Sequence, residues 1–312
     1  MYYIGIDLGG TNIAAGLVSE EGKILIQDSV PTRSERPAEE IVKDMAELSK
    51  KLIKEYGITE KDVKSVGVGC PGSIDFENGV VVYSNNIKMD HFPLAAEFRK
   101  TLDLPIKIDN DANCAAMGEY VATGENCSSF IFVTLGTGVG GGIVLNGQML
   151  RGFNGAGGEI GHMTLIMDGE PCTCGKNGCW ESYASVTALI RQTKEAAEKN
   201  PQSLMNKLIE EEGRVSGRTS FEAAKAGDEA AKAVVEQYAK YVAEGIVNIE
   251  NIFQPDIIAV GGGISREGDY LLEPVREIVA KKGYNKYMEK TKIVTAKLFN
   301  DAGIIGAAMV AR

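Results

Sequence analysis

The sequence predicts an α/β protein that is built from two similar halves. A glycine-rich segment near the N-terminus, residues 7–12, reappears in altered form at residues 135–140. Each copy lies between two apolar runs that are typical of strands, and a turn signal follows each pair. Strand and helix patterns alternate along the rest of the chain, as they do in α/β folds. The length of 312 residues suits two domains of ~150 residues each.

The individual elements follow from the spacing of apolar residues and from helix-ending residues. Residues 37–56 carry apolar side chains at helical spacing, and Gly57 then ends the helix. Further strands are expected at 23–26, 63–70, 105–108, 256–260 and 292–296, and further helices at 94–102, 112–123, 223–253 and 270–282. The expected domains are residues 1–108, joined by the closing helix 301–312, and residues 109–300.

Composition and charge limit the classes of protein to consider. Apolar residues make up 44% of the chain and charged residues 24%, which is typical of a soluble globular protein. The net charge of −10 predicts repulsion of nucleic acid and of anionic membranes, so neither is an expected partner. The start of the chain has no signal-peptide pattern, and the longest apolar stretch, 130–145, is broken by glycines. We therefore expect a cytoplasmic protein.

The two glycine segments are candidate phosphate-binding loops. Two turns that expose backbone N–H groups toward each other would form a clamp for a polyphosphate, whereas either loop alone is more simply a hairpin turn that needs glycine. Their matched positions favour nucleotide binding, although neither has the Walker or dinucleotide spacing. Because the chain is acidic, the nucleotide would depend on local dipoles and Mg²⁺. The loop residues are Gly9, Gly10, Thr11, Asn12, Gly136, Thr137, Gly138 and Gly140.

Three cysteines and a histidine form a candidate zinc site. Cys172, Cys174 and Cys179 fall within eight residues, and His162 lies ten residues before the first of them. Three thiolates and one imidazole complete a tetrahedral zinc site without an open position, which is typical of a structural metal. Disulfides or unrelated thiols are the alternatives, but a reducing cytosol disfavours disulfides, and pairing would leave one of the three thiols over.

Three carboxylates near these motifs are candidates for chemistry. Glu159 lies three residues before His162 and Glu181 two residues after Cys179, so a metal would tie both segments together. Convergent carboxylates and a second imidazole nitrogen suit a ligand with many hydroxyl groups, whereas the alternative for each Glu is a solvated surface charge. Asp111 stands where a strand ends and a helix begins. It could cap that helix or act as the general base of a phosphoryl transfer, and the two roles are compatible.

Together these motifs resemble those of the ROK family of sugar kinases and repressors, over nearly the whole chain. The resemblance rests on residues 7–12, 109–113, 135–142, 158–162, 172–181 and 261–264, of which the cysteine motif is the most specific. It implies an actin-like ATPase (ribonuclease H-like) fold, with a cleft between duplicated halves. It also implies ATP-dependent phosphorylation of a hexose, and conversion of glucose to glucose 6-phosphate in carbohydrate metabolism is the expected reaction.

The resemblance also implies roles for individual residues. Asp111 would be the base toward the sugar 6-hydroxyl, and Asp7 would lie near Mg²⁺ and the phosphates. The turn at Gly262 and Gly263 would approach the adenosine. The residues implied to bind sugar are Gly72, Asn86, Asn110, Asp111, Glu159, His162 and Glu181. The implied cofactors are ATP, Mg²⁺ and structural Zn²⁺, and the implied assembly is a homodimer or homotetramer.

Other functions stay open at this point. Met89 stands where such kinases often carry tryptophan, so N-acetylmannosamine, N-acetylglucosamine or fructose are alternative substrates. A sugar-responsive repressor would need a DNA-binding segment before the first loop, where only six residues precede Asp7. A zinc module for nucleic acid is opposed by the acidic charge. A sugar sensor without catalysis is the remaining alternative within the family.

Overall fold

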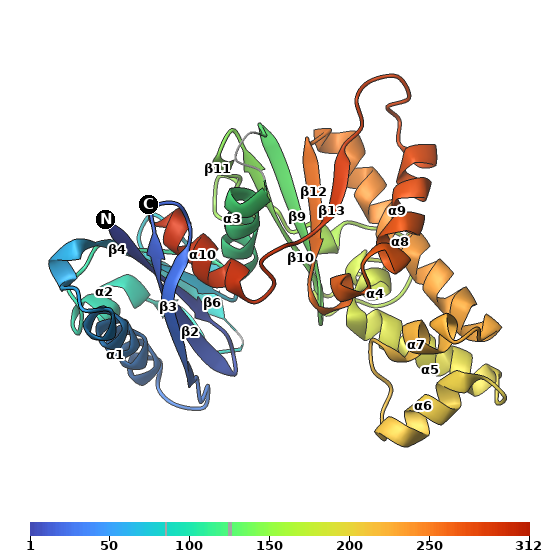
Figure 1. Ribbon diagram of the computed structural model, residues 1–312, viewed down its shortest axis with the longest axis horizontal. Helices are drawn as coiled ribbons and strands as arrows, with labels where there is room; N and C mark the ends of the chain where they lie inside the picture. The colour runs from blue at the N-terminus through green and yellow to red at the C-terminus, as the bar shows by residue number, and fades with distance from the viewer. Residues whose placement is uncertain (85, 124–126) are drawn as a thin grey trace. The chain divides into compact units, whose positions relative to one another are not determined.

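The computed structural model describes residues 1–84, 86–123 and 127–312, which group into two compact units. The first unit comprises Met1–Phe132, Gly142–Gly158 and Lys297–Arg312, and the second comprises Val133–Gly141 and Glu159–Ala296 (Figure 1). This division by contacts differs from the boundary expected at residue 108. Helix α3 (Asp111–Thr123) packs on the C-terminal helix α10 (Asp301–Val310), and this packing places both helices in the first unit.

A five-stranded sheet forms the centre of the first unit, in the order β3-β2-β1-β4-β8. Its strands are β1 (Tyr2–Leu8), β2 (Asn12–Ser19), β3 (Ile24–Pro31), β4 (Val63–Cys70) and β8 (Ile106–Asn110). The first three pair antiparallel, whereas β4 runs parallel to β1 and β8 parallel to β4. Asp7 of β1 lies opposite Gly69 of β4, which in turn lies opposite Asp109 of β8. The carboxyl ends of these three strands therefore meet at one end of the sheet and bring acidic residues together there.

Helix α1 (Ala38–Tyr56) covers this sheet with the apolar face that the sequence predicts. Its side chains at helical spacing, Ile41, Met45, Leu48 and Leu52, are buried in one core with residues of the strands. Gly57 ends the helix in the left-handed conformation, with φ of 81°, and its N–H bonds back to the last turn. The predicted helix and its end are thus confirmed. A shorter helix, α2 (Leu94–Arg99), follows further along the chain.

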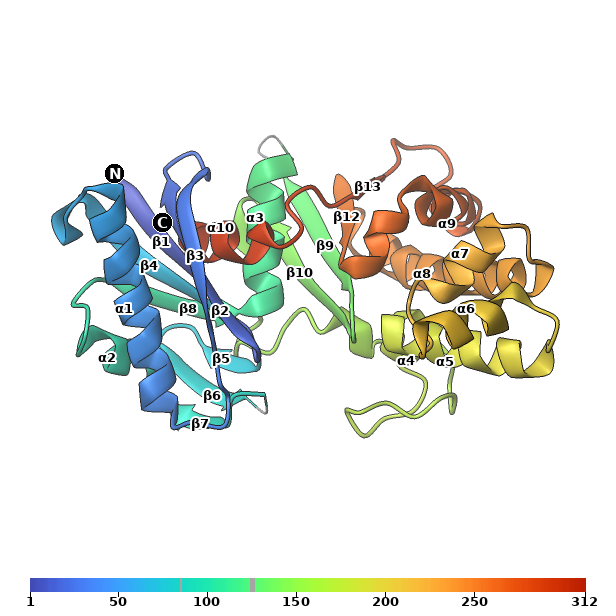
Figure 2. The same ribbon diagram turned by 60° about the horizontal axis from the view of Figure 1, so that its bottom comes forward.

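Three short strands form a separate antiparallel sheet in the first unit (Figure 2). They are β5 (Ser73–Asp75), β6 (Val80–Ser84) and β7 (Met89–Phe92). Apolar periodicity does not predict them, because strands of three to five residues contain too few positions for an alternating pattern. The sheet matters for the site because β5 begins directly after Gly72.

Helix α10 packs against β1, β4 and α3 with its backbone in direct contact (Figure 1). A Cβ atom at Gly5 of β1 would overlap the carbonyl oxygen of Ile304 in α10. A Cβ atom at Gly306 of α10 would overlap the carbonyl oxygen of Cys114 in α3, and Gly67 of β4 is equally close to α10. Only glycine lets three elements approach one helix at this distance, so the packing depends on these residues.

The second unit is built on a sheet in the order β11-β10-β9-β12-β13. The strands of this sheet are β9 (Ser129–Leu135), β10 (Val139–Leu145), β11 (Gln148–Met149), β12 (Ile257–Gly261) and β13 (Lys292–Thr295). Strands β12 and β13 lie in the second unit, β9 and β10 are divided between the two units, and β11 lies in the first. The helices of this unit are α4 (Glu181–Ala184), α5 (Val186–Lys199), α6 (Leu204–Glu212), α7 (Thr219–Lys225), α8 (Glu229–Phe253) and α9 (Asp269–Lys282). Helix α8 carries Gly245, where a Cβ atom would overlap the buried ring of Trp180. That ring also donates from Nε1 to the carbonyl oxygen of Tyr241 at 2.8 Å.

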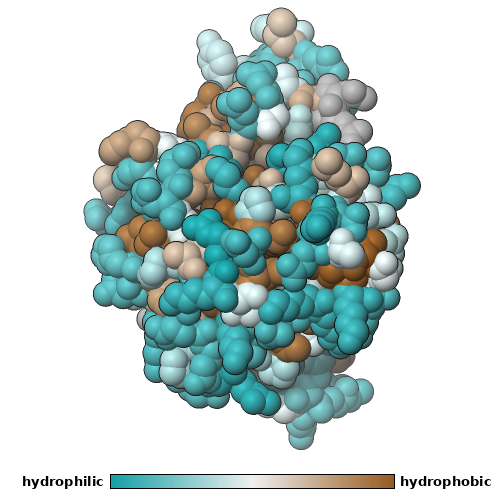
Figure 3. Space-filling view, turned by 90° about the vertical axis from the view of Figure 1, so that its left-hand side faces the viewer, coloured by the Kyte–Doolittle hydropathy of each residue, from teal (hydrophilic) through white to brown (hydrophobic). Residues whose placement is uncertain are grey.

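The face of the first unit in Figure 3 is mainly hydrophilic, with hydrophobic residues in small, separate groups. Such scattered apolar groups are ordinary on a water-exposed surface. Among the described helices, none combines the length and the apolar character that crossing a membrane requires.

The contact of α10 with α3 leads to a stability prediction. Alanine normally stabilises a helix relative to glycine by ~1 kcal/mol, but at Gly306 the added methyl group would overlap the backbone of α3. We expect Gly306→Ala to lower the free energy of unfolding by ~2 kcal/mol or more, measured by urea denaturation. The control is Gly263→Ala, since no atom lies within 4 Å of a Cβ atom there. Equal stability of the two variants would contradict the packing described.

Candidate active site and metal centre

The end of β8 and the start of α3 place Asn110 and Asp111 in different roles. Asn110 Oδ1 accepts hydrogen bonds from the N–H groups of Ala112 at 2.9 Å and Asn113 at 3.3 Å, so Asn110 caps the helix. Asp111 Oδ1 also accepts from Ala112 N–H at 2.9 Å, and its side chain is otherwise exposed at the first helical position. The capping role that the sequence allows for Asp111 thus belongs mainly to its neighbour, which leaves Asp111 available for chemistry.

The pKa values of Asp7 and Asp111 are both raised above the ordinary value of an aspartate. Burial, followed by the negative charge of Asp111, raises the pKa of Asp7 to about 6. Burial from water also raises the pKa of Asp111, and this effect exceeds the opposing effect of the hydrogen bond from Ala112 N–H, which lowers the pKa. The space beside Asp7 is closed by Gly303 of α10, where a Cβ atom would lie 2.7 Å from Asp7 Oδ2. Two carboxyl groups that both resist ionisation are typical of a site that binds a cation or transfers a proton.

Asp109 and Arg151 form a buried ion pair next to these carboxylates. Asp109 is 2% exposed, and its Oδ2 accepts from both Nε and Nη2 of Arg151, at 2.8 and 2.7 Å. Its Oδ1 accepts from the N–H of Asn110 at 2.8 Å and from Asn113 Nδ2 at 2.9 Å. The guanidinium of Arg151 lies 3.8 Å from the ring centre of Phe76. A paired charge of this kind holds the backbone before Asp111, and neither Asp109 nor Arg151 was predicted as a site residue.

Two of the predicted sugar-binding residues of the first unit lie together. Asn110 Nδ2 donates to the carbonyl oxygen of Gly72 at 3.2 Å. Gly72 has φ of 117°, and a Cβ atom there would overlap the carbonyl oxygen of Tyr83, so the turn requires glycine. A third predicted residue, Asn86, lies beside the first phosphate loop, with its Cβ 3.8 Å from the Cβ position of Gly10.

In both glycine loops, carbonyl oxygens accept hydrogen bonds from neighbouring residues. In the first unit, Thr32 donates from Oγ1 to Gly9 O at 2.6 Å and from its N–H to Thr11 O at 2.8 Å. In the second unit, Thr187 Oγ1 donates to Thr137 O at 2.7 Å, and Val186 N–H donates to Gly136 O at 2.8 Å. Within the loops, Gly9 N–H donates to Asn12 O and Gly136 N–H donates to Gly138 O, each at 3.0 Å, so the first amide of each loop closes its turn. The amides at 10–11 and at 137 are therefore the candidates for binding phosphate.

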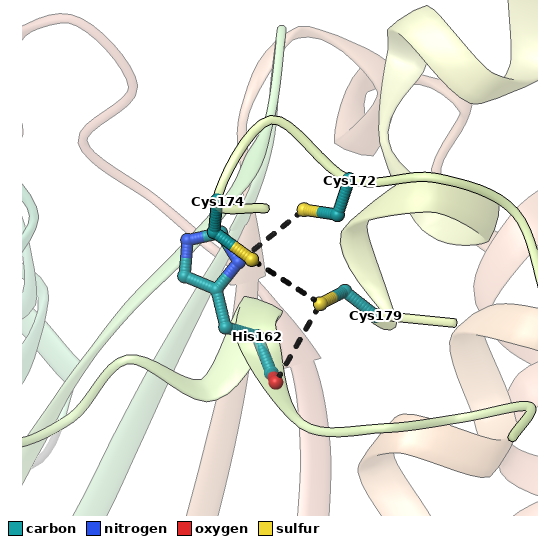
Figure 4. A group of neighbouring side chains, drawn as sticks. All are labelled: His162, Cys172, Cys174 and Cys179. Carbon is teal, nitrogen blue, oxygen red and sulfur yellow. Dashed lines mark hydrogen bonds between the residues drawn. The ribbon is translucent and has the colours of Figure 1, made fainter. Parts of the chain in front are cut away.

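The predicted zinc ligands converge on one point in the second unit (Figure 4). Their candidate ligand atoms all lie within 4.8 Å of one another. Cys172 Sγ lies 3.6 Å from His162 Nδ1, and Cys174 Sγ lies 3.6 Å from Cys179 Sγ. Four ligands on a tetrahedral zinc with Zn–S bonds of ~2.3 Å place sulfurs ~3.8 Å apart, whereas a disulfide needs ~2.05 Å. The three cysteines are free thiols, and their spacing fits a metal and not a disulfide.

Tight turns bring these ligands together. Gly175 and Gly178 have φ of 89° and 80°, and Cys172 N–H donates to Lys176 O at 2.8 Å. Gly178 also packs against Ile166, and a Cβ atom added at Gly178 would overlap the carbonyl oxygen of Ile166. The two glycines thus supply the backbone conformation that the sequence predicts for convergence of the sulfurs.

The two predicted glutamates of the second unit have different surroundings. Glu159 is exposed and precedes the short 3₁₀ turn Ile160–His162. Glu181 is partly buried, and its Oε2 accepts from the N–H of Val139 at 3.0 Å. At the end of β12, Gly262 has φ of 86° and lies against Leu135, the residue before the second glycine loop. Gly263 beside it faces open space.

The sequence profile of the ROK family matches residues 3–312. The chain belongs to the ROK family. It is 38% identical to the glucokinase of Thermotoga maritima, covering 98% of this chain and 96% of that protein. It is 35% identical to the glucokinase of Halalkalibacterium halodurans, covering 100% of this chain and 95% of the other.

A solved glucokinase structure and a xylose repressor are also similar to this chain. The structure of a ROK glucokinase from Streptomyces griseus, in complex with glucose and AMPPNP, matches with a TM-score of 0.82 and 35% identity, covering 100% of this chain and 99% of that one. The two-unit α/β architecture and this match confirm the predicted actin-like ATPase fold class. The xylose repressor of Caldicellulosiruptor bescii is 30% identical, and the match covers 98% of this chain but 77% of the repressor.

The raised pKa of Asp7 generates a pH prediction. Because the folded state raises this pKa from 3.8 to about 6, protonated Asp7 favours folding; this contribution is complete below pH 3.8 and is lost as the pH rises through 6. In metal-free buffer we expect Asp7→Asn to be more stable than wild type by ~1–3 kcal/mol at pH 8, with a smaller difference at pH 5. Urea unfolding at both pH values measures this. Asp103→Asn, at an exposed position, is the control, and a pH-independent effect of Asp7→Asn would contradict the assignment.

Proposed function

We propose that this protein transfers the γ-phosphoryl group of ATP to the 6-hydroxyl of glucose, with Asp111 as general base. The observation that carries the proposal is the placement of Asp111 at the start of α3, where Asn110 caps the helix and leaves the carboxylate exposed. The raised pKa of Asp111 makes it a better proton acceptor than an ordinary aspartate. The identity to glucokinases over the whole chain supports the same reaction.

The two glycine loops would hold the polyphosphate of ATP. Hydrogen bonds from Thr32 and Thr187 hold the loop carbonyls, and the amides at 10–11 and at 137 would bind the phosphate oxygens. Asp7 is the residue that we expect near Mg²⁺, because burial and then the negative charge of Asp111 destabilise its carboxylate, and a cation would offset both effects. When bound, Mg²⁺ supplies positive charge to the phosphates. Gly262 and Gly263 would lie near the adenosine, where Gly263 leaves open space.

The residues that would bind the sugar are the ones that the family resemblance implies. The candidates are Gly72, Asn86 and Asn110 of the first unit, and Glu159, His162 and Glu181 of the second. Carboxylate oxygens accept hydrogen bonds from sugar hydroxyls, and an amide side chain can both donate and accept. His162 turns Nδ1 toward Cys172, so Nε2 is the ring nitrogen that is available to a hydroxyl.

The cluster of His162, Cys172, Cys174 and Cys179 would hold one structural zinc ion. The donor set and the 3.6 Å sulfur spacing fit tetrahedral zinc, and the four ligands leave no position for a substrate. The ion would fix the segments that carry Glu159 and Glu181. We also infer a cytoplasmic enzyme of glycolysis that assembles as a homodimer or homotetramer, on the resemblance to the family.

A coupled assay of ADP release tests the reaction. The purified protein is given MgATP with glucose, fructose, N-acetylmannosamine, N-acetylglucosamine or no sugar, and glucose is expected to give the highest kcat/KM. The sugar panel addresses specificity, which Met89 leaves open. Binding of glucose without release of ADP would instead indicate the alternative, a sugar sensor of the same family.

The role of Asp111 predicts a selective loss of turnover. Asp111→Asn keeps the size of the side chain and removes the basic oxygen, so kcat is expected to fall by at least ~10²-fold while the glucose Kd stays within ~3-fold of wild type. Steady-state kinetics and calorimetry measure the two quantities. The exposed Asp103→Asn variant is the control. A kcat of Asp111→Asn within threefold of wild type would exclude it as the base.

The metal site predicts the zinc content of the protein. Protein purified without chelator is expected to contain one zinc ion per chain by elemental analysis, and Cys174→Ser is expected to lose it, because three ligands hold zinc much less tightly than four. Cys127→Ser, outside the cluster, should keep the metal. Wild-type protein without zinc would refute the proposal.

A further inference from the structure

The carboxylate of Glu181 lies between the metal cluster and the second glycine loop. Its Oε2 accepts from the N–H of Val139, the first residue of β10 after Gly138, at 3.0 Å. Its Oε1 lies 3.7 Å from Cys172 Sγ, so the other oxygen of the same carboxylate contacts the cluster. Glu181 is thus in contact with both features at once, and it comes from the first position of helix α4.

Gly138 of the loop is in direct contact with the same carboxylate. A Cβ atom at this position would overlap Glu181 Oε2, and the carboxyl carbon of Glu181 would lie 3.1 Å from it. At Gly136, two residues earlier in the same loop, a Cβ atom would have no described residue within 4 Å apart from its own chain neighbours. Neither residue has a positive φ angle, so backbone conformation alone does not require glycine at either. A side chain at 138 would therefore displace the carboxylate of Glu181.

Other hydrogen bonds to the loop are made at different atoms. Gly136 O accepts from Val186 N–H and Thr137 O accepts from Thr187 Oγ1, both at the start of α5. These bonds fix the carbonyl side of the loop. The N–H of Val139 is the point at which the chain leaves the loop for β10, and Glu181 is the residue that binds it.

We propose that Glu181 is a positioning residue for the phosphate loop, and that through it the sugar and nucleotide sites of the second unit are coupled. This inference rests on the proposed function, in which Glu181 binds sugar and residues 136–138 bind phosphate. A sugar that orders the Glu181 carboxylate also orders the loop that it holds, and displacement of the loop displaces the sugar ligand. Coupling of this kind is reciprocal, so each ligand raises the affinity for the other.

Two alanine variants of the loop test the coupling by glucose binding alone. Gly138→Ala places a methyl group against Glu181, so the glucose Kd is expected to rise at least ~10-fold in calorimetry without nucleotide. Gly136→Ala adds the same methyl group to the same loop without touching Glu181, and its glucose Kd is expected to stay within ~2-fold of wild type. If the loop affects only nucleotide binding, the two variants will have the same glucose Kd. That result would overturn the inference.

A double-mutant cycle separates the contact with Glu181 from a direct effect on phosphate. The Kd of Mg²⁺–AMPPNP is measured for Gly138→Ala, Glu181→Ala and the combined variant. Removal of Glu181 removes the atom that the new methyl group would meet, so Gly138→Ala is expected to weaken AMPPNP binding at least ~3-fold less in the Glu181→Ala background. Equal effects in both backgrounds would overturn the inference.

A conservative variant and the wild type complete the test. Glu181→Gln keeps the size of the side chain but makes it a weaker hydrogen-bond acceptor, so its Kd for Mg²⁺–AMPPNP is expected to rise at least ~3-fold. This measurement tests the inference independently if Gly138→Ala does not fold. An unchanged Kd would contradict the positioning role. Wild-type protein that binds neither glucose nor AMPPNP would overturn the proposed function and this inference together, whereas normal wild-type binding without coupling would overturn the inference alone.

Discussion

The acidic end of the first unit depends on the backbone contact between α10 and its neighbours. Glycines at positions 5, 67 and 306 allow this helix to lie directly on β1, β4 and α3. The same helix carries Gly303, which closes the space beside Asp7 and keeps its carboxylate in place. Asp7 comes from β1 and Asp111 from α3, so one helix sets the positions of both carboxylates. Burial at this position raises the pKa of both carboxyl groups, and in the proposed function Asp7 lies near the cation and Asp111 accepts the proton.

The second unit repeats the phosphate loop with a different support. In both units a threonine hydroxyl binds a loop carbonyl from behind, Thr32 in the first and Thr187 in the second, at 2.6 and 2.7 Å. The second unit adds the cysteine and histidine cluster, whose last cysteine lies two residues before Glu181. The cluster therefore stabilises a segment that contacts the loop through a carboxylate. In the proposed function, a metal held by this cluster would support the loop that binds the nucleotide without itself contacting the nucleotide.

The sequence predicts most of the fold because its strongest signals are local. Both glycine hairpins, the apolar face of α1 with Gly57 at its end, and the convergence of His162 with three cysteines are confirmed. The pairing of Asp109 with Arg151 could not be predicted, since a buried carboxylate implies a cation but does not say which of many basic residues supplies it. The capping role of Asn110 was also missed, because Asn and Asp are equally good caps and stand next to each other here.

The most direct test of the account is the chemical identity of the product formed from glucose and ATP. The account predicts a phosphate ester whose phosphorus couples to the two protons on C6 in ¹H–³¹P correlation spectra, because Asp111 is proposed to activate the 6-hydroxyl. It also predicts that this product disappears when glucose is replaced by 6-deoxyglucose. Phosphate attached at the anomeric carbon, or release of inorganic phosphate as the main product, would contradict the assignment of these carboxylates to phosphoryl transfer.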